Sequence, residues 1–301
     1  MVSPQHKRRA VQLVKEAGLC SERRACQYLR INRSSGRYRQ KEPSDWLLKL
    51  NKQVQSHSKK YPRLGYRKLT RILQSEGWKV GKKLIQRIRR ECGLRVKRWL
   101  KKQSRRGQST GSIPTKAKGI DHVWCWDFVA ERTDDGGKLR ILSIVDEYTR
   151  ECLAIHVART ITSSDLITLM DNLIAKRGIP GHIRSDNGPE VIAKILQKWL
   201  QHRNIKTLYI DPGSPWQNGH IESFNACLRD ECLNQELILS VAEARVISED
   251  YRQHYNNQRP HGGIGYRTPV QAYREALGSS RPTDSFHQEL ETSSNTAMIN
   301  P

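Results

Sequence analysis

One apolar segment that contains a single charge constrains the fold of this 301-residue chain more than any other feature. The segment Val123–Val129 reads Val-Trp-Cys-Trp-Asp-Phe-Val, and Asp127 is its only charged residue. An apolar run of this length is typical of a buried β-strand. A carboxylate buried in a strand is costly unless it is paired or binds a cation. The fold must therefore provide Asp127 with a partner or with a cation.

Two later stretches each place a carboxylate at the boundary of a regular element. The stretch His182–Glu190 predicts a strand that ends at Asp186, then an Asn-Gly turn and the start of a helix. The stretch Asp211–Asn225 predicts a turn-rich loop that runs into a helix carrying Glu222. That helix begins either at Pro215, with Ser214 as its cap and Gln217 completing a capping box, or later, at Asn218-Gly219.

The side of the helix on which Glu222 lies follows from its neighbours. Ile221, Phe224 and Leu228 recur at helical spacing and predict a buried face. Glu222 therefore projects from a different side, and a carboxylate held in this way suits a metal ion. The interval between Asp186 and Glu222 proves little, because 30 acidic residues in the chain make any separation common.

Two other acids are the best alternative candidates for such a site. Asp146 also follows an apolar strand, but Glu147 and Tyr148 come next, as in a turn that ends a strand. Glu190 opens the helix after the Asn-Gly turn. If Asp127, Asp186 and Glu222 converge, their charges repel unless cations lie among them. Two divalent ions about 4 Å apart would offset the repulsion and clamp the oxygens of a phosphoryl displacement. Oxygen-only ligands favour Mg²⁺, with Mn²⁺ as a substitute.

The net charge of +23 is unevenly distributed. Residues 1–120 hold 34 Lys and Arg against 6 Asp and Glu, a net charge of +28, so the remainder is acidic. A short run of like charges is usually a solvated surface. Here the excess fills a whole third of the chain, which indicates a polyanionic partner, and double-stranded DNA is the obvious one.

Residues 1–44 predict a small helix-turn-helix-like module that binds DNA. The pattern indicates a helix over Pro4–Ala17 and a second helix capped by Ser21. A third, basic helix is expected to start at Ser34 or Ser35. Its candidate DNA contacts are Arg37 and Arg39, with Lys41 on the same helix. The alternative is a small helical bundle that is merely basic.

Residues 45–96 predict a second helix-turn-helix-like module. A helix from Asp45 is expected to fray over Ser56–Lys60, and a second helix contains Leu69, followed by a turn. The third helix, Lys82–Glu91, is capped by Gly81, and glycine is an acceptable cap. Its expected outward-facing basic residues are Lys82, Lys83, Arg87, Arg89 and Arg90. All of these except Arg89 are candidate DNA contacts.

The rest of the chain predicts a linker, a catalytic core and a tail. Residues 97–120 are a basic linker without periodicity, and residues 279–301 are a disordered tail. Residues 121–278 change to a mixed α/β pattern. Three antiparallel strands come first, and helices then alternate with strands. The expected elements are strands at 122–131, 138–146 and 151–159, a helix at 164–177, a strand ending at 185, a helix at 189–203 and a strand at 207–210.

Several classes of protein are disfavoured by composition. No segment approaches the 18 to 20 apolar residues that span a membrane, and no signal peptide is recognisable at the start. The seven cysteines are odd in number and scattered, which favours a reducing cytoplasm over a disulfide framework. No Cys-x-x-Cys pair occurs, so a structural zinc site is not expected.

The carboxylate-bearing stretches resemble the motifs of a known enzyme family. Ser185–Glu190 and Gly213–Asn225 resemble the second and third motifs of the integrase core shared by retroviral integrases and many bacterial transposases. Trp124–Val129 resembles the first catalytic strand, and Tyr255–His261 the closing segment. Within that group the chain resembles the OrfB-type transposase of the IS-three family of insertion sequences. The zinc module of retroviral integrases is missing.

The resemblance implies a fold, an activity and a set of partners. The fold is a ribonuclease H-like core of mixed α+β and α/β character, preceded by all-α modules. The activity is metal-dependent 3′-end nicking and strand transfer of an insertion sequence, with Asp127, Asp186 and Glu222 as catalytic and metal-binding residues. The partners are the element ends and target DNA, further copies of the chain on that DNA, and the product of an upstream reading frame. The place of action is the cytoplasm, at the bacterial nucleoid.

Two questions remain open from sequence. Trp216, Gln217 and Asn218 precede Glu222 in a glycine-containing loop and either contact DNA or pack within the loop. A non-enzymatic or domesticated DNA-binding regulator would share the basic modules, although the three intact acids argue against it. A simple nuclease is a second alternative, and the appearance of joined products distinguishes it from a transposase.

Overall fold

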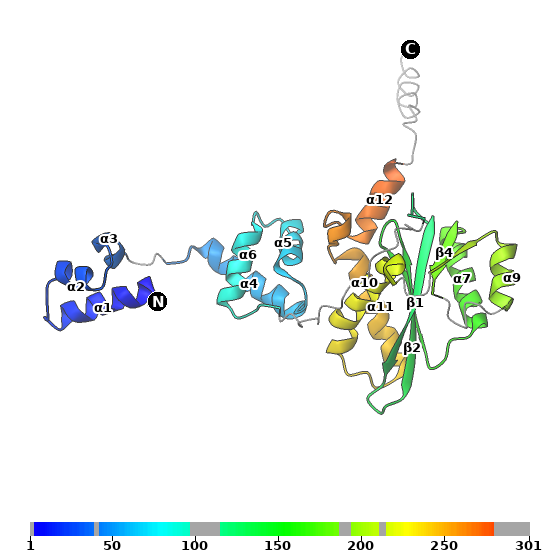
Figure 1. Ribbon diagram of the computed structural model, residues 1–301, viewed down its shortest axis with the longest axis horizontal. Coiled ribbons are helices and arrows are strands. Elements are labelled where there is room, and N and C mark those ends of the chain that lie inside the picture. The colour runs from blue at the N-terminus through cyan, green and yellow to red at the C-terminus, as the bar shows by residue number, and fades with distance from the viewer. Residues whose placement is uncertain (1–2, 39–41, 97–114, 187–193, 211–214, 280–301) are drawn as a thin grey trace, which may run out of the picture. The chain divides into compact units, whose positions relative to one another are not determined.

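The computed structural model describes residues 3–38, 42–96, 115–186, 194–210 and 215–279 (Figure 1). The side chains of Pro215 and Trp216 lie outside this described part. The chain divides into two compact units, residues 1–53 and 54–301, and each is described by itself. Among the described residues, no helix is both long and apolar enough to cross a bilayer.

The first unit begins with three helices, α1 (Pro4–Glu16), α2 (Glu22–Tyr28) and α3 (Arg33–Gly36). The Ser21 hydroxyl caps α2 by accepting a hydrogen bond from the Arg24 backbone N–H, as the sequence predicts. Val11, Ala25 and Cys26 form a small buried core between these helices.

The prediction of a basic third helix is wrong. Helix α3 has only four residues, its N-cap is Asn32, and Arg37 is already its C-cap. Arg37 is paired with Glu22 at 2.6 Å, so part of its charge is offset within the module. Arg39 and Lys41 lie outside the described residues. Asn32 takes the N-cap position without a side-chain cap hydrogen bond, so Ser34 and Ser35 fall inside the helix.

The second helical module consists of α4 (Asp45–Lys60), α5 (Tyr66–Ser75) and α6 (Lys82–Glu91). Helix α4 crosses the division between the units and continues to Lys60, so the expected fraying from Ser56 is wrong. Ser58 is buried in that last stretch, which shows that the helix end is packed. Gly81 is the N-cap of α6, as predicted.

A five-stranded mixed sheet forms the centre of the second unit, in the order β3-β2-β1-β4-β5. The strands are β1 (Val123–Arg132), β2 (Lys138–Asp146), β3 (Cys152–Ala158), β4 (His182–Ser185) and β5 (Lys206–Tyr209). Strands β1, β2 and β3 pair antiparallel, whereas β4 and β5 join parallel to β1 and to each other. The expected succession of three antiparallel strands and then alternating helices and strands is confirmed.

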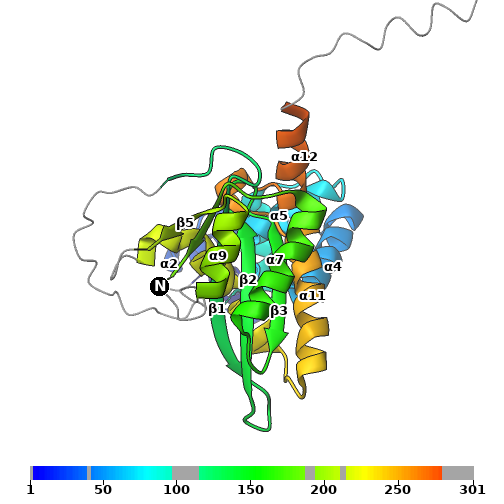
Figure 2. The same cartoon turned by 90° about the vertical axis from the view of Figure 1, so that its right-hand side faces the viewer.

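Helices cover both faces of this sheet (Figures 1 and 2). One face is covered by α7 (Ser163–Arg177) and α9 (Lys194–His202), and the other by α10 (Gly219–Glu231) and α11 (Val241–Asn257). The described part of the chain ends with short 3₁₀ turns and α12 (Pro269–Ser279). Of the helix predicted at 189–203, the first residues lie outside the described part.

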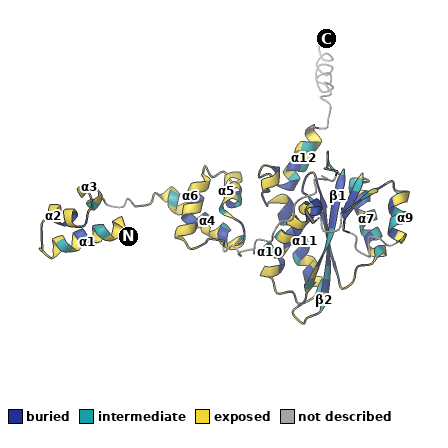
Figure 3. Cartoon of the chain, viewed as in Figure 1, coloured by how far each residue is buried: buried dark blue, intermediate teal, exposed yellow. Residues whose placement is uncertain are grey.

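Side chains of β1 alternate between the two hydrophobic cores. Val123, Cys125 and Val129 belong to the core beneath α10 and α11, whereas Trp124 and Trp126 belong to the core beneath α7 and α9. Buried residues accordingly line both sides of the sheet (Figure 3). A strand buried on both faces reads as a continuous apolar run, which explains the sequence of β1. Asp127 therefore lies on the α10 face by the two-residue period.

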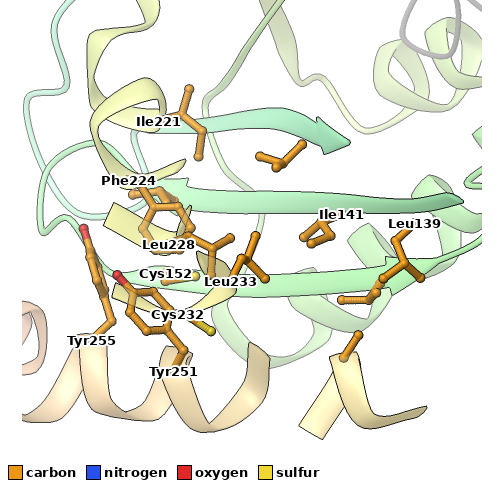
Figure 4. Packing of buried hydrophobic residues seen from close by; sticks show 14 of the residues in the cluster. Leu139, Ile141, Cys152, Ile221, Phe224, Leu228, Cys232, Leu233, Tyr251 and Tyr255 are labelled. Atoms are coloured by element: carbon orange, nitrogen blue, oxygen red, sulfur yellow. The ribbon is translucent and has the colours of Figure 1, made fainter. Parts of the chain in front are cut away.

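The open question about the start of α10 is settled in favour of the later position. Pro215–Asn218 forms a 3₁₀ turn, and the α-helix begins at Gly219. Ile221, Phe224 and Leu228 are buried against Tyr251 and Tyr255 of α11 (Figure 4). The Phe224 and Tyr255 rings meet edge to face at 4.7 Å, which fixes α10 against α11.

Candidate active site

The register of the central strands brings Asp127 and Asp186 together. Strand β4 runs parallel to β1 with Val123 opposite His182 and Cys125 opposite Arg184. Asp186 follows directly after the last residue of β4, and extension of this register by two residues sets it opposite Asp127. Paired residues of parallel strands point to the same face, so both carboxylates face α10.

Helix α10 supplies the third carboxylate and a direct link to the first. Asn225 of this helix donates a hydrogen bond from its Nδ2 atom to Oδ2 of Asp127 over 3.0 Å. Glu222 lies three residues earlier in the first turn of the same helix and is exposed. Residues three apart share a helix face, so Glu222 projects on the side that contacts Asp127. The role of Asn225 was missed in the sequence because an asparagine in a helix has no distinctive pattern.

The electrostatic surroundings of Asp127 include the other two carboxylates. Burial raises the pKa of Asp127 above its usual value, while N–H groups of Phe128 and Asn225 lower it in part. The nearby charges of Asp186 and Glu222 raise the pKa of Asp127 further. Both hydrogen-bond partners of Asp127 are neutral. The site thus concentrates negative charge around a partly buried carboxylate, which favours a cation.

Of the two alternative acids, Asp146 does not join this group. Asp146 pairs with Trp124 in the register and lies on the opposite face, with Ile144 and Leu142. It accepts hydrogen bonds from the N–H and the hydroxyl of Thr149, so it organises the turn after β2. Glu190 lies outside the described residues.

A buried ion pair fixes the start of α10 on the sheet. Arg184 of β4 donates to Glu147 Oε2 over 2.7 Å, and both side chains are about 5% exposed or less. The same guanidinium donates to the Gln217 carbonyl over 3.2 Å. Arg184 thus ties β4 and the end of β2 to the 3₁₀ turn before Glu222. No sequence pattern signals this pairing, because its partners are 37 and 33 residues away.

His220 lies beside this pair and is not suited to general-base work. Its Nε2 atom is 3.9 Å from Glu147 Oε1. Burial, followed by the charge of Arg150, lowers the pKa of His220 to about 4, although Glu147 opposes this shift. The ring is therefore neutral at pH 7 and a weak base.

The structure places the predicted DNA-contacting residues in different surroundings. Gln217 and Asn218 are buried, and Asn218 Nδ2 is 3.5 Å from the Trp126 carbonyl, which favours packing within the loop. The Trp216 side chain lies outside the described part. On α6, four predicted residues are exposed, namely Lys82, Lys83, Arg87 and Arg90. The expectation that Arg89 faces outward is wrong, because its guanidinium is buried and donates to the carbonyls of Leu64 and Leu94.

The closing segment packs beneath α10. Arg259 is 3% exposed and forms a two-point ion pair with Glu231 at 2.6 Å. His261 is buried against Tyr255, with ring centroids 4.4 Å apart. Burial, followed by the charge of Arg259, lowers the pKa of His261 to about 3. These residues support the helix that carries Glu222.

Three protein-family models match the chain. An integrase core domain matches residues 118–215, a further integrase core model matches residues 203–269, and an HTH-like domain matches residues 48–103. The two integrase matches cover the strands and helices that hold Asp127, Asp186 and Glu222.

Similar proteins come from bacterial insertion elements. A 39.2 kDa protein of insertion element IS476 from Xanthomonas euvesicatoria is 34% identical over 90% of this chain and 77% of its own length. A 31.7 kDa protein of insertion element IS407 from Burkholderia multivorans is 33% identical over 85% of this chain and 91% of its own length. The putative transposase InsK of IS150 from Escherichia coli K12 is 23% identical, with 69% and 77% covered. This chain belongs to the IS3-type transposases of insertion elements.

Membership defines the fold and the class of reaction. The chain has a ribonuclease H-like core and is a DDE polynucleotidyl transferase that acts in DNA transposition. DNA is its partner, and this family depends on divalent metal. Among solved structures, the catalytic core domain of HTLV-2 integrase in complex with magnesium has a TM-score of 0.44 and 19% identity, and covers 52% of this chain and 99% of that chain.

Proposed function

We propose that Asp127, Asp186 and Glu222 are the catalytic carboxylates of this transposase and bind two Mg²⁺ ions, with Mn²⁺ as a substitute. The observation that carries the proposal is the hydrogen bond from Asn225 to Asp127, because it fixes the helix of Glu222 against the strand of Asp127. The parallel register of β1 and β4 supports the placement of Asp186.

The donor set fits a hard divalent cation. All three proposed ligands are carboxylates, which Mg²⁺ prefers to nitrogen or sulfur donors. The Oδ1 atom of Asn225, whose Nδ2 contacts Asp127, is buried without a hydrogen-bond partner in the described part. Such atoms commonly mark ordered water or ions. As placed, no three His, Cys, Asp or Glu side chains of the described residues enclose an ion, so closure of the cage belongs to the proposal.

The protein's own contribution is to position and orient. Strands β1 and β4 hold two carboxylates on a rigid sheet, and the Arg184–Glu147 pair fixes the turn from which Glu222 projects. Bound divalent ions supply charge stabilisation for the attacking and leaving oxygens of an in-line displacement. Hydrolysis at an element end frees a 3′-hydroxyl, which then attacks a phosphodiester of the target and displaces another 3′-oxygen.

The remaining parts of the chain are proposed to deliver the DNA. Residues 1–44 and 45–96 bind duplex DNA as two modules, residues 97–120 link them to the core at 121–278, and residues 279–301 form a tail. Further copies of the chain are proposed to assemble on the paired element ends, and the product of an upstream reading frame to assist in end recognition. Such an enzyme works where the DNA is, at the bacterial nucleoid.

The test is the substitution Glu222→Gln, which keeps the shape of the side chain and removes one negative charge. Duplex DNA binding is expected to persist, while nicking and joining in magnesium fall at least about a hundredfold, equivalent to about 2.7 kcal/mol of transition-state stabilisation. Gel shifts measure DNA binding. An intact element end reports nicking, and a pre-nicked end reports joining.

Asp146→Asn is the matched control, because it makes the same chemical change on the other face of the sheet. Circular dichroism verifies the fold of both variants. If folded Glu222→Gln joins ends at the parent rate, the proposed metal site is wrong. Nicked but never joined products from the parent would identify a simple nuclease instead.

A further inference from the structure

A basic groove lies between the second helical module and the closing segment of the core. Two cavities of about 600 Å³ and 390 Å³ share Arg67 and Tyr266 in their walls. Together they are called the Tyr266 groove. Its cationic lining residues are Arg67, Lys68, Arg71, Lys82, Arg89, Arg90 and Arg95, of which Arg89 is buried. They come from α5, α6 and the residues after α6, whereas Tyr266 comes from a segment about 170 positions later.

The charge of this groove is not offset from within. None of the described residues that line either cavity is an Asp or a Glu. Arg67, Arg71, Arg90 and Arg95 are exposed. Lys68 differs, because its Nζ atom is 3.9 Å from Glu231 and is half-buried. Clustered guanidinium groups in a concave surface concentrate positive potential and favour an anionic occupant.

Tyr266 is held in an unusual conformation at the centre of the groove. Its φ of +63° is rare for a residue with a large side chain, and it follows Gly265, whose φ is +69°. A bridge between His261 and Arg267 closes this turn. The guanidinium of Arg71 lies over the Tyr266 ring, 5.4 Å from its centroid. A strained tyrosine maintained by its surroundings and presented among arginines suggests a binding role.

The two walls of the groove are fixed to each other by specific contacts. The Tyr61 ring stacks on His254 of α11 at 4.7 Å, and its hydroxyl donates to Gln258 over 3.0 Å. Arg63 is paired with Asp230 near the end of α10. These contacts join the helical module to the helices of the core, so the groove is preformed and does not need ordering when a ligand binds.

We propose that the Tyr266 groove binds the phosphate backbone of duplex DNA, independently of base sequence. Planar guanidinium groups bind phosphate oxygens bidentately, and such contacts set the register of a protein on a duplex. Lys82 and Arg90 of α6 border the same groove, so a duplex lying on α6 reaches the turn of Tyr266 in the core. The inference rests on the proposed action on DNA, and it adds a core segment to the DNA-binding surface.

The experiment compares triple variants of the full chain by fluorescence anisotropy over a range of salt concentrations, without divalent metal. One duplex carries the element end and the other has an unrelated sequence. The variant Arg67→Ala, Arg71→Ala, Arg95→Ala removes three charges from the groove. The slope of log affinity against log salt is expected to become shallower by about 3, with both duplexes weakened equally.

Two further triple variants are controls. One removes the same charge away from the groove, and the other keeps the charge within it. Lys176→Ala, Lys194→Ala, Lys198→Ala removes three exposed charges from α7 and α9 and is expected to keep the parent slope. Arg67→Lys, Arg71→Lys, Arg95→Lys preserves the charge and is expected to restore most of the slope.

Three outcomes overturn the proposal. The first is a parent-like slope in the alanine variant of the groove, which would leave the groove to a different anion such as an acidic protein segment. The second is an effect on the element-end duplex alone, which would indicate base recognition. The third is equal loss in the alanine and lysine variants, which would indicate a structural role. Because binding is measured without metal, failure of Glu222→Gln to affect joining would sink the catalytic proposal and leave this one standing.

Discussion

At the residue scale, Asp127 reports whether the three carboxylates converge. Burial raises its pKa, and the charges of Asp186 and Glu222 add to this effect. Either Asp186→Asn or Glu222→Gln should therefore lower the pKa of Asp127 in the metal-free protein, because each removes a repelling charge. Carboxyl ¹³C NMR titration measures this directly. Asp146→Asn, on the other face, should leave the titration of Asp127 unchanged. If the pKa of Asp127 is unchanged by both Asp186→Asn and Glu222→Gln, the three carboxylates are not close to one another.

Asp146 makes a separate prediction about stability. Burial raises its pKa from 3.8 to about 6, against the lowering effect of Thr149. The native protein therefore retains a proton that the unfolded chain has released between about pH 4 and pH 6. Stability falls as pH rises through this window, by up to about 3 kcal/mol from this group. The Asp146→Asn variant should lack this contribution to the fall in stability, and it should still join DNA ends.

The measurement is urea unfolding of the parent and of Asp146→Asn at pH 4.5 and at pH 7, with the difference between the two proteins compared at each pH. The contribution of Asp127 and other shared groups cancels in this comparison. Parallel pH dependence of the two proteins would show that Asp146 is not buried as a proton-binding carboxyl.

At the element scale, the Arg184–Glu147 pair connects two strands to the turn before α10. Glu147→Gln leaves the guanidinium buried without its counter-charge, which typically costs about 3 to 5 kcal/mol. Glu249→Gln is the control, since 52% of its side chain is exposed in the i,i+3 pair with Arg252, and surface pairs contribute about 1 kcal/mol or less. Chemical denaturation should show a large loss for Glu147→Gln only. Equal losses would mean that the buried pair adds no more than a surface one.

The same elements show how far the sequence predicts this fold. The strands and α10 follow from local patterns, because an apolar run or a helical stripe at Ile221, Phe224 and Leu228 reports burial directly. The short α3 was not predictable, since cap preference at Asn32 and at the following serines is nearly equal.

The candidate site shows the same limit. Asp127 stands out because a charge in an apolar strand is costly, whereas the Asn225 contact and the Arg184 pair depend on packing between distant segments. Local sequence carries no signal for partners that tertiary structure alone brings together. The opposite orientation of Asp146 likewise needs the register of β1 and β2, which places it beside Trp124.

At the scale of the whole molecule, charge and chemistry are separated along the chain. Residues 1–120 hold the excess of +28, whereas the core carries the three proposed catalytic carboxylates, Asp127, Asp186 and Glu222. The basic part attracts DNA over a distance, and the core keeps the local negative charge that divalent cations require. A core that was itself strongly basic would compete with those cations for the same carboxylates. The Tyr266 groove lies between α5 and α6, which belong to the basic part, and the closing segment of the core.

This separation predicts that affinity for DNA resides mainly in the first part of the chain. A fragment of residues 1–118 should bind duplex DNA with an affinity that falls steeply as salt rises, because each neutralised phosphate releases counterions. A fragment of residues 119–301 should bind much more weakly at the same salt. It retains Tyr266, but its net charge is negative. Anisotropy titrations of both fragments and of the full chain between 50 and about 200 mM salt measure the contrast. Circular dichroism establishes that each fragment is folded before its affinity is interpreted. If the folded core fragment bound DNA as tightly and with the same salt dependence as the full chain, the basic third would be a solvated surface and not the part that captures DNA.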